Sequence, residues 1–414
     1  MSDIHMTAGM DIGNGYVKAR VACDGGQPRG IDLPSSVTYV SPSTAWLPKE
    51  PSAEYVDDLV NELDCTIDSP CIRQTDRGRI LVGSRSVDSG DTQVLFNIDD
   101  HVPKCDDSLA YELALSVLAA EAVRHVYAET GALPTDVPHV TCAMGVALPI
   151  SDYMDYRDRY RANFMGSSHR VTIHNFERPI AVDITFDVVT VLAEGAAAQY
   201  AINALGPKYL DLALAQSRAA GVPCDESETG ETLFSYKNTA LVDIGEGTTN
   251  FPIFRDSYLS PETSSSINEG YGTVLSKVVA ATRNLNYAPA TRKELAAFML
   301  DDSVSGAKRK IKNKLQRLID EETSVFVRDV VAEYKHVLSR TKLSVDVTYV
   351  FGGGAAPVRT QLLPAIVEAS RLDDDIYIPV IYLDSAYSRD LNRNGLYIVA
   401  QLSEQALAQQ AAQA

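Results

Sequence analysis

The sequence predicts an α/β protein that is built from two related lobes. Strand-like and helix-like segments alternate through most of the chain, which is typical of α/β architecture. A turn with the pattern D-I-G-x-G occurs at residues 11–15 and again at 243–247. The length of 414 residues is enough for two or three domains of about 150 residues each.

Composition and charge exclude several classes of protein. The chain is 45% apolar and 22% charged, which excludes a largely disordered or collagen-like protein. Its net charge of −18 repels phosphate backbones, so we expect no direct contact with nucleic acid. No apolar run is long enough to cross a membrane and no secretory pattern opens the chain, so we expect a cytoplasmic protein. The six cysteines lack C-x-x-C spacing and are expected to be free thiols.

The first elements are a hairpin and a long helix. The hairpin is expected over 9–23, with the first D-I-G-x-G segment as its turn, because Asn-Gly readily adopts positive φ. Residues 28–105 are rich in Pro and Asp and are expected to carry a small inserted subdomain. A helix is expected over 106–130, capped by Asp107 or Ser108. Its apolar residues recur at helical spacing and should face the core: Leu109, Leu113, Val117, Ala120 and Tyr127.

The remaining elements continue the alternation. Strands are expected over 139–148, 180–191, 239–243 and 345–351. Helices are expected over 192–205, 288–341 and the tail from 385. Pro252 removes a ladder hydrogen bond, so the strand after the second turn should be short or lie at an edge. The first lobe is expected to comprise 1–190 with 385–414, and the second 191–384 with a smaller subdomain near 270–335.

The repeated turn carries the main functional prediction. A Gly-rich turn exposes successive backbone N–H groups and lets the main chain approach phosphate oxygens. The aspartates that open the two turns, Asp11 and Asp243, are placed to hold Mg²⁺ through water. Two such turns suit a nucleoside triphosphate bound in a cleft between two lobes. A third Gly-rich segment, 352–355, follows a strand and lets the backbone approach a base or an α-phosphate.

These motifs, in this order, resemble the phosphate-1, phosphate-2 and adenosine segments of the superfamily of actins, heat-shock chaperones and sugar kinases. The matching residues are 11–18, 243–249 and 352–355. The opening motif is most similar to plasmid-segregation actins of the ParM type, and 145–153 is similar to the G-L-P-x-x-x-Y stretch of bacterial and archaeal actin-like proteins. The resemblance implies an actin-like ATPase fold of two duplicated ribonuclease-H-like lobes with a nucleotide cleft between them.

The resemblance also implies a site for ATP or ADP with Mg²⁺. Lys18 would reach the β- and γ-phosphates as a point charge. The implied nucleotide-binding residues are Asp11, Gly13, Asn14, Gly15, Tyr16, Lys18, Gly245, Glu246, Gly247, Thr248, Thr249, Gly352, Gly353, Gly354 and Ala355. The implied catalytic residues are Asp11, Asp243 and Glu194, of which Glu194 would orient the attacking water. Alternatively, Glu194 is an ordinary carboxylate favoured by the dipole at a helix N-terminus.

Two assignments in the second lobe stay open. In the relatives a helix of this lobe contacts the ribose, and both 291–299 and the basic run 308–314 are candidates. The residues 308–317 include six cations. They are either a solvated helix face or a contact with an acidic patch of a neighbouring subunit.

The leading functional hypothesis is an ATPase that assembles with itself into dynamic filaments. The resemblance to ParM implies segregation of plasmid DNA through a separate DNA-binding adaptor of the ParR type. One alternative is a small-molecule kinase on the same scaffold, for which the sequence offers only Asp152 as a catalytic residue. A chaperone-like ATPase is not expected, because only 60 residues follow Gly354.

Overall fold

The computed structural model describes residues 3–42, 47–96, 102–285, 288–342 and 344–413. The chain divides into two compact units. The first comprises Met1–Ala201 and Asn392–Ala414, and the second comprises Ile202–Leu391. The first limit lies 11 residues and the second 7 residues after the limit expected from the sequence.

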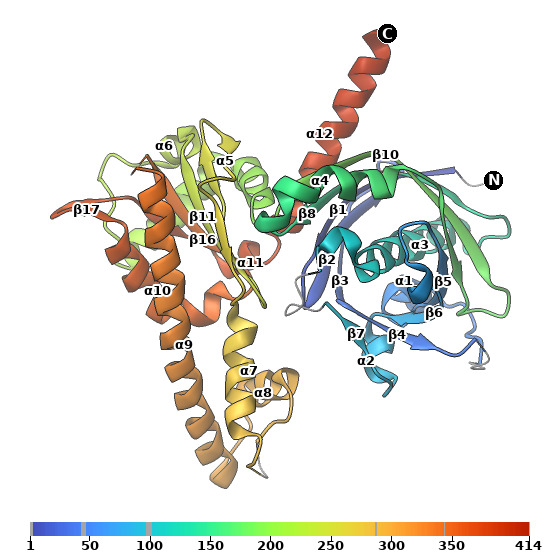
Figure 1. Cartoon of the computed structure of the whole chain (residues 1–414), viewed down its shortest axis with the longest axis horizontal. Coiled ribbons are helices and arrows are strands. Elements are labelled where there is room, and N and C mark those ends of the chain that lie inside the picture. Colours follow the sequence, from blue (N-terminus) through green and yellow to red (C-terminus); the bar gives the residue numbers. More distant parts are fainter. Residues whose placement is uncertain (1–2, 43–46, 97–101, 286–287, 343, 414) are drawn as a thin grey trace. The chain divides into compact units, whose positions relative to one another are not determined.

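The first unit is built on a ten-stranded sheet that curls around one helix (Figure 1). In sheet order its strands are β3 (Arg29–Pro34), β2 (Tyr16–Cys23), β1 (Asp3–Ile12), β8 (His139–Leu148), β10 (Ile180–Ala193), β9 (His169–Ile173), β5 (Asp64–Asp68), β6 (Arg79–Val82), β4 (Ser36–Val40) and β7 (Val94–Leu95). The strands β1, β8 and β10 are parallel, and the other neighbours are antiparallel. The predicted first hairpin and the strands predicted at 139–148 and 180–191 are confirmed.

The segment 28–105 contributes strands to both ends of this sheet. β3 pairs with β2 at one end, and β5 pairs with β9 toward the other. These strands therefore continue the main sheet and do not form a sheet of their own. Short helices and 3₁₀ turns connect them or follow them: α1 (Ala53–Asp57), η1 (Leu59–Glu62), η2 (Gln74–Asp76), α2 (Ser84–Asp88) and η3 (Lys104–Asp106).

The helix inside the curled sheet is α3 (Ser108–Thr130) (Figure 1). Asp107 is its cap, because Asp107 Oδ1 accepts a hydrogen bond from Leu109 N at 3.0 Å. The expected apolar residues lie in the core, but so do most other positions of the helix, including Glu112 and Glu121. Elements of the 28–105 segment, namely β4, β5, α1 and η1, also pack against this helix and bury its other positions.

The helix α12 (Leu391–Gln413) lies directly against the centre of this sheet. A Cβ on Gly9 would lie 2.1 Å from Tyr397 N, and a Cβ on Gly145 would lie 2.2 Å from Leu396 O. Glycine is therefore required at both strand positions, because the two backbones approach too closely for a side chain. The helical tail predicted from 385 is confirmed, although it is divided into α11 (Ser385–Ser388) and α12.

The second unit repeats the core of the first. Strand β11 (Thr239–Ile244) pairs antiparallel with β12 (Thr249–Phe251) and β13 (Ile253–Arg255), and parallel with β16 (Val347–Phe351). β16 in turn pairs parallel with β19 (Val380–Tyr382). In the first unit β1 has the same neighbours: an antiparallel hairpin partner, and two successive parallel strands on its other side. This repeated topology confirms the predicted α/β fold of two related lobes.

The strand after the second turn is short, as Pro252 predicts. β12 ends before this proline and β13 begins after it. Proline cannot donate to the ladder, but its carbonyl still accepts a hydrogen bond from Leu241 N at 2.9 Å. The remaining short strands of the second unit are β14 (Tyr258–Leu259), β15 (Ser265–Ile267), β17 (Arg371–Asp373) and β18 (Ile376–Tyr377).

The helical stretch predicted over 288–341 is confirmed, and the chain forms it as two helices. α8 (Arg292–Leu300) and α9 (Gly306–Arg340) are separated by a short loop. In that loop Asp301 Oδ1 accepts hydrogen bonds from Ser303 N at 2.9 Å and from Ser303 Oγ at 2.6 Å. Such side-chain bonds compete with helical backbone bonding. This unit also contains α6 (Gly230–Ser235), α7 (Tyr271–Thr282), α10 (Ala355–Ala369), α11 and most of α5 (Ala197–Ala219).

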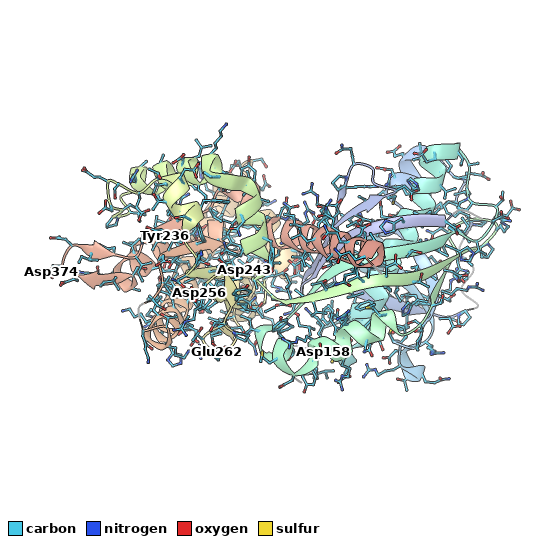
Figure 2. All side chains as sticks on the ribbon, turned by 90° about the horizontal axis from the view of Figure 1, so that it is seen from above. Asp158, Tyr236, Asp243, Asp256, Glu262 and Asp374 are labelled. Carbon is cyan, nitrogen blue, oxygen red and sulfur yellow. The ribbon has the colours of Figure 1, made fainter. Side chains whose placement is uncertain are left out.

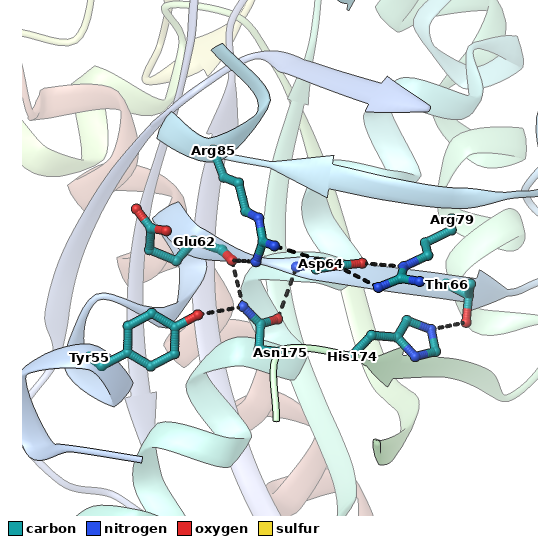
Figure 3. Close-up of polar contacts among 8 residues, drawn as sticks. All are labelled: Tyr55, Glu62, Asp64, Thr66, Arg79, Arg85, His174 and Asn175. Atoms are coloured by element: carbon teal, nitrogen blue, oxygen red, sulfur yellow. Dashed lines mark hydrogen bonds and ion pairs between the residues drawn. The ribbon is translucent and has the colours of Figure 1, made fainter. Parts of the chain in front are cut away.

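A buried polar network joins β5 to its neighbours in the first unit (Figure 3). Asp64 is fully buried and accepts two hydrogen bonds from Arg79, Nε to Oδ1 at 2.7 Å and Nη2 to Oδ2 at 2.9 Å. Arg85 Nη2 lies 3.6 Å from Asp64 Oδ2. Asn175 Oδ1 accepts a hydrogen bond from Asp64 N at 2.9 Å, and its amide donates to the Tyr55 hydroxyl at 2.8 Å.

All six cysteines lie among the described residues and are free thiols, as predicted. Four are buried and two are half-buried. In the part of the chain that the structure describes, no helix combines the length and the apolar character needed to cross a bilayer.

Candidate functional site

The two D-I-G-x-G segments form the same hairpin turn. In the first unit Gly13 N donates to Tyr16 O at 3.1 Å, and in the second Gly245 N donates to Thr248 O at 2.9 Å. In both turns a Cβ on the first glycine, Gly13 or Gly245, would lie 3.0 Å from the carbonyl oxygen that closes the turn. The repeat in the sequence is therefore a repeat in backbone geometry.

The aspartate before each turn faces an equivalent position across its hairpin. Asp11 is in register with Lys18, and Asp243 is in register with Asn250. Directly opposed residues of an antiparallel pair point to the same face of the sheet. The first turn therefore sets a carboxylate beside a cation, and the second sets a carboxylate beside an amide. Asn250 is buried, and its Oδ1 has no hydrogen-bond partner among the described residues.

Lys104, which the sequence analysis did not single out, connects the first turn to Glu194. Its side chain is only 5% exposed. The Nζ atom donates to Ile12 O at 2.6 Å and to Glu194 Oε1 at 2.7 Å. A lysine is rarely buried without a partner, so this pair stabilises both charges. The backbone N of Lys104 donates to Oδ2 of Asp152, the residue considered for a kinase, at 3.2 Å.

Asp11 lies within the electrostatic reach of these residues. Burial raises the pKa of the Asp11 carboxyl above its usual value. Lys18 and Lys104 oppose this rise in pKa, Glu194 adds to it, and a hydrogen bond from Asn392 lowers it. A buried carboxylate of this kind gains from a nearby cation, which stabilises its charged form. Asp11 therefore fits a place beside a metal ion.

Glu194 lies in a turn and not in a helix, which corrects one expectation. The helix predicted from 192 begins later, as α5 (Ala197–Ala219), because β10 runs on to Ala193 in register with β8. Gly195 has φ 76°, which is incompatible with helix. Glu194 N donates to Leu148 O at 2.7 Å. Its carboxylate is paired with Lys104, so a helix dipole is not its main partner.

Ser35 supports the first turn from the β3–β4 connection. It is 1% exposed, its Oγ donates to Gly13 O at 2.6 Å, and its N donates to Gly15 O at 3.0 Å. The turn therefore accepts bonds that fix its carbonyls while Asn14 stays half-buried. No pattern in the sequence marked Ser35.

The start of α7 supports the second turn. Tyr271 N donates to Gly245 O at 3.1 Å and Gly272 N donates to Glu246 O at 2.8 Å. A Cβ on Gly270 would lie 2.5 Å from Glu246 O. The two glycines around Tyr271 are a signal in the sequence that could have predicted this close approach.

The third Gly-rich segment lies against the second turn. Gly354 N donates to Ile244 O at 2.8 Å. Gly352 has φ 106°, and a Cβ there would lie 2.6 Å from Asp243 Oδ1. Both features require glycine. In the second unit the residues 243–247 and 352–355 therefore belong to one local site, with Asp243 at its centre.

Of the two helices considered for a ribose contact, α8 lies beside the second turn. Arg292 Nη1 is 3.1 Å from Glu246 Oε1. In the basic run, Lys312 instead donates to Asp301 O at 2.8 Å and lies 3.9 Å from Asp302 Oδ1. The geometry favours 291–299 as the segment near the predicted site.

The predicted site residues thus form two groups. The first unit holds Asp11, Gly13, Asn14, Gly15, Tyr16, Lys18 and Glu194. The second unit holds Asp243, Gly245, Glu246, Gly247, Thr248, Thr249, Gly352, Gly353, Gly354 and Ala355. The hydroxyl of Thr249 donates to Glu269 O at 2.8 Å, Tyr16 is 45% exposed and Gly353 is exposed. Their contact with a nucleotide stays a prediction.

The acidic residues fit Mg²⁺ better than a metal held by protein alone. Among the described residues, no three His, Cys, Asp or Glu side chains converge in a way that could hold a metal ion. Mg²⁺ usually keeps several waters and is bound by one or two carboxylates together with substrate phosphates. Asp11 and Asp243, each set beside a phosphate-type turn, match that pattern of donors.

A separate pocket of about 410 Å³ lies in the first unit, between β1, β2 and α12. Its walls include His5, Thr7, Arg20, Tyr397 and Glu404. None of the predicted site residues lines it.

Comparison with known proteins decides the fold family. Residues 241–363 match the family model of the archaeal actin homologue MreB-like, C-terminal. The whole chain is similar in structure to the actin-like protein Alp7A, with a TM-score of 0.64, 16% sequence identity and coverage of 99% of this chain and 100% of that one. The protein has an actin-like fold. The resemblance inferred from the three motifs is therefore confirmed.

Other solved structures with this actin-like fold include ParM and an archaeal protein. Bacillus thuringiensis ParM with ADP has a TM-score of 0.57 and 15% identity, covering 97% of this chain and 99% of that one. Ta0583, an archaeal actin homologue, has a TM-score of 0.57 and 12% identity with the same coverage. No curated protein matches the chain in sequence.

Proposed function

We propose that this protein is an ATPase that binds ATP with Mg²⁺ and assembles with itself into filaments. One observation carries the proposal: the same glycine hairpin occurs once in each unit, after an aspartate at the same register position. ParM from Bacillus thuringiensis, which is similar in fold, has been solved with ATP, with ADP and with AMPPNP. A nucleotide with several phosphates provides acceptors for both turns.

The backbone N–H groups of the two turns other than those of Gly13 and Gly245, which close the turns, bind the phosphates. Lys18 adds a positive charge. Asp11 and Asp243 hold Mg²⁺ through water. When bound, the ion neutralises charge on the phosphate oxygens. The segment 352–355 receives the adenosine, and α8 lies near the ribose.

In the second part of this proposal, Glu194 orients the water that attacks the γ-phosphate. Lys104 holds the Glu194 carboxylate in place through their 2.7 Å contact. The same ammonium group fixes the first turn through Ile12 O, at 2.6 Å. Lys104 is thus a positioning residue, which couples the phosphate-binding turn to the water-orienting carboxylate.

Hydrolysis weakens contacts between copies and makes the filaments dynamic, which is the mechanical part of the proposal. The specific cellular role that we propose for the filaments is segregation of plasmid DNA in the cytoplasm through a DNA-binding adaptor of the ParR type. The net charge of −18 suits this division of labour, since the chain itself would not bind the phosphate backbone.

Sedimentation and light scattering test the proposal. We expect a polymer with Mg²⁺ and ATP or AMPPNP, and little polymer with ADP or without nucleotide. Glu194→Gln should assemble with ATP but release phosphate at a rate lower by about 10²-fold or more. Absence of nucleotide binding, or pelleting that does not depend on nucleotide, would reject it. Phosphate transfer to a sugar without pelleting would favour the kinase.

A further inference from the structure

We propose that two surfaces of the second unit bind each other between copies of this chain. The first, the basic tip, comprises Leu300 at the end of α8 and the residues 301–317 that follow. The second, the acidic hairpin, comprises residues 371–377 around β17 and β18. The inference rests on the proposed self-assembly and names the surfaces that carry it.

The basic tip combines positive charge with an exposed apolar side chain. The residues 301–317 contain six cations and two aspartates, a surplus of four positive charges in a chain with net charge −18. Lys308, Arg309 and Lys310 are all exposed, and α9 first buries a residue in the core at Leu315. Leu300 is 81% exposed at the same place in the fold. The beginning of α9 thus packs against little of its own unit.

The acidic hairpin has the complementary composition. Asp373, Asp374 and Asp375 are exposed at its turn, and Figure 2 shows Asp374 pointing outward from the hairpin. Arg371 Nη2 lies 2.8 Å from Asp374 Oδ1, which leaves a surplus of two negative charges over 371–377. Two apolar side chains, Leu372 and Ile376, flank the aspartates, and they are 42% and 56% exposed.

The two surfaces are complementary in apolar character and in charge, the two properties that protein interfaces combine. The exposed apolar side chains of the two surfaces can leave water together, and the opposite charges beside them favour the correct partner and register. The occupant that satisfies both surfaces at once is a second copy of this chain.

Geometry makes this contact intermolecular. Figure 1 shows the beginning of α9 at one extremity of the second unit and β17 at another. A contact between two different surfaces is heterologous, so after two copies bind, each copy keeps one free surface and the pair has a free tip at one end and a free hairpin at the other. Repetition of such a contact produces a filament when the rotation between copies does not close into a ring.

A pair of charge-reversed variants tests the inference on the full-length protein. Variant A carries Lys308→Glu, Arg309→Glu and Lys310→Glu, so its tip and its hairpin are both acidic. Variant B carries Asp373→Lys, Asp374→Lys and Asp375→Lys, so both surfaces are basic. We expect each variant alone to need at least a tenfold higher concentration than the wild type to assemble. An equimolar mixture should assemble again, because A and B can alternate.

The matched control is Arg328→Glu with Lys335→Glu, which reverses two exposed charges farther along the same helix. It should assemble like the wild type. All variants should keep the wild-type circular dichroism and the wild-type affinity for ATP, since the changed residues are exposed and lie outside the proposed nucleotide site.

The outcomes separate this inference from the proposed function. If A and B assemble like the wild type, or if their mixture stays monomeric in sedimentation velocity, the inference is overturned while nucleotide-dependent assembly can still stand. If only variant A differs from the wild type, and what it loses is binding to double-stranded DNA, then the basic tip binds an anionic polymer. The inference is overturned in that case too. A wild type that never assembles, with or without nucleotide, rejects the proposed function and this contact together.

Discussion

Lys104 Nζ lies 2.7 Å from Glu194 Oε1, in a buried ion pair between residues that are 90 positions apart in the sequence. The two side chains are 5% and 12% exposed. Because the same ammonium group binds the carbonyl of Ile12, this pair ties the first glycine turn to the carboxylate proposed to orient water.

We predict that Lys104→Met lowers the rate of ATP hydrolysis by about 10²-fold, because Glu194 loses the group that orients it. Removal of one partner of a buried pair also costs about 3–5 kcal/mol of unfolding free energy. Phosphate release and thermal denaturation measure the two effects. Exposed Lys49→Met is the control and should leave both unchanged.

A double variant separates catalysis from stability at this pair. Lys104→Met with Glu194→Gln removes the uncompensated charge and should recover most of the unfolding free energy. The hydrolysis rate should stay low, since neither group then acts on water. Recovery of hydrolysis in the double variant would contradict the roles proposed for both Lys104 and Glu194.

Gly352→Ala should abolish ATP binding through the second unit. The new Cβ would lie 2.3 Å from Ile244 O and 2.6 Å from Asp243 Oδ1, and φ is 106°. The backbone must shift, and with it the aspartate before the second turn. Gly221→Ala is the matched control, because φ is 81° there but no atom lies within 4 Å of the new Cβ. It should cost only about 1 kcal/mol and keep ATP binding, as isothermal titration can measure.

Glu112 predicts a pH dependence of stability. Burial raises the pKa of Glu112 to about 7, and its Oε2 has no hydrogen-bond partner among the described residues. As pH rises above about 4.5 the unfolded state ionises first, so the unfolding free energy falls until the folded carboxyl ionises near pH 7. The loss between pH 4 and pH 8 is about 3 kcal/mol.

Urea denaturation at pH 4, 6 and 8 measures this dependence. Glu112→Gln keeps the shape of the side chain and the hydrogen bond with the Tyr39 hydroxyl, which lies 2.7 Å from Oε1. The unfolding free energy of this variant should therefore change less with pH over the same window than that of the wild type. An unchanged slope would mean that other groups set it.

Local patterns predicted most of the fold, because each unit is built around strands with clear apolar runs and turns. The hairpin at the first turn and the strand at 139–148 were predictable from the alternation of strand-like and helix-like segments and from the Gly-rich turn. Errors arose where tertiary contacts override local preference. Leu192 and Ala193 have helix-forming neighbours, but pairing with β8 keeps them in the strand.

The candidate site likewise contains residues that local patterns predict and residues that only tertiary contacts reveal. The two turns were predictable from their glycines, although neither Asn14 nor Gly15 adopts the positive φ expected of an Asn-Gly turn. Gly352 has φ 106° and does occupy a backbone geometry that glycine marks. Lys104 and Ser35 were not, because their roles come from contacts with distant residues and neither lies in a distinctive motif. Asn250 could have been found by aligning the two repeats, since it occupies the position of Lys18.

Two arginine–aspartate contacts of equal length offer a final prediction about stability in the first unit. Arg79 Nε lies 2.7 Å from Asp64 Oδ1, and Arg73 Nε lies 2.7 Å from Asp76 Oδ2. The Arg79 side chain is 14% exposed and Asp64 is fully buried, whereas the Arg73 side chain is 58% exposed. Equal distances therefore isolate the effect of burial.

Arg79→Ala leaves the Asp64 carboxylate buried with only the longer contact to Arg85, so the unfolding free energy should fall by about 3–5 kcal/mol. Arg73→Ala should cost about 0–1 kcal/mol, because water replaces an exposed partner. Added salt should shrink the second loss and leave most of the first, since buried pairs are weakly screened. Denaturation at low and high salt measures both, and equal losses for the two variants would contradict the role assigned to burial.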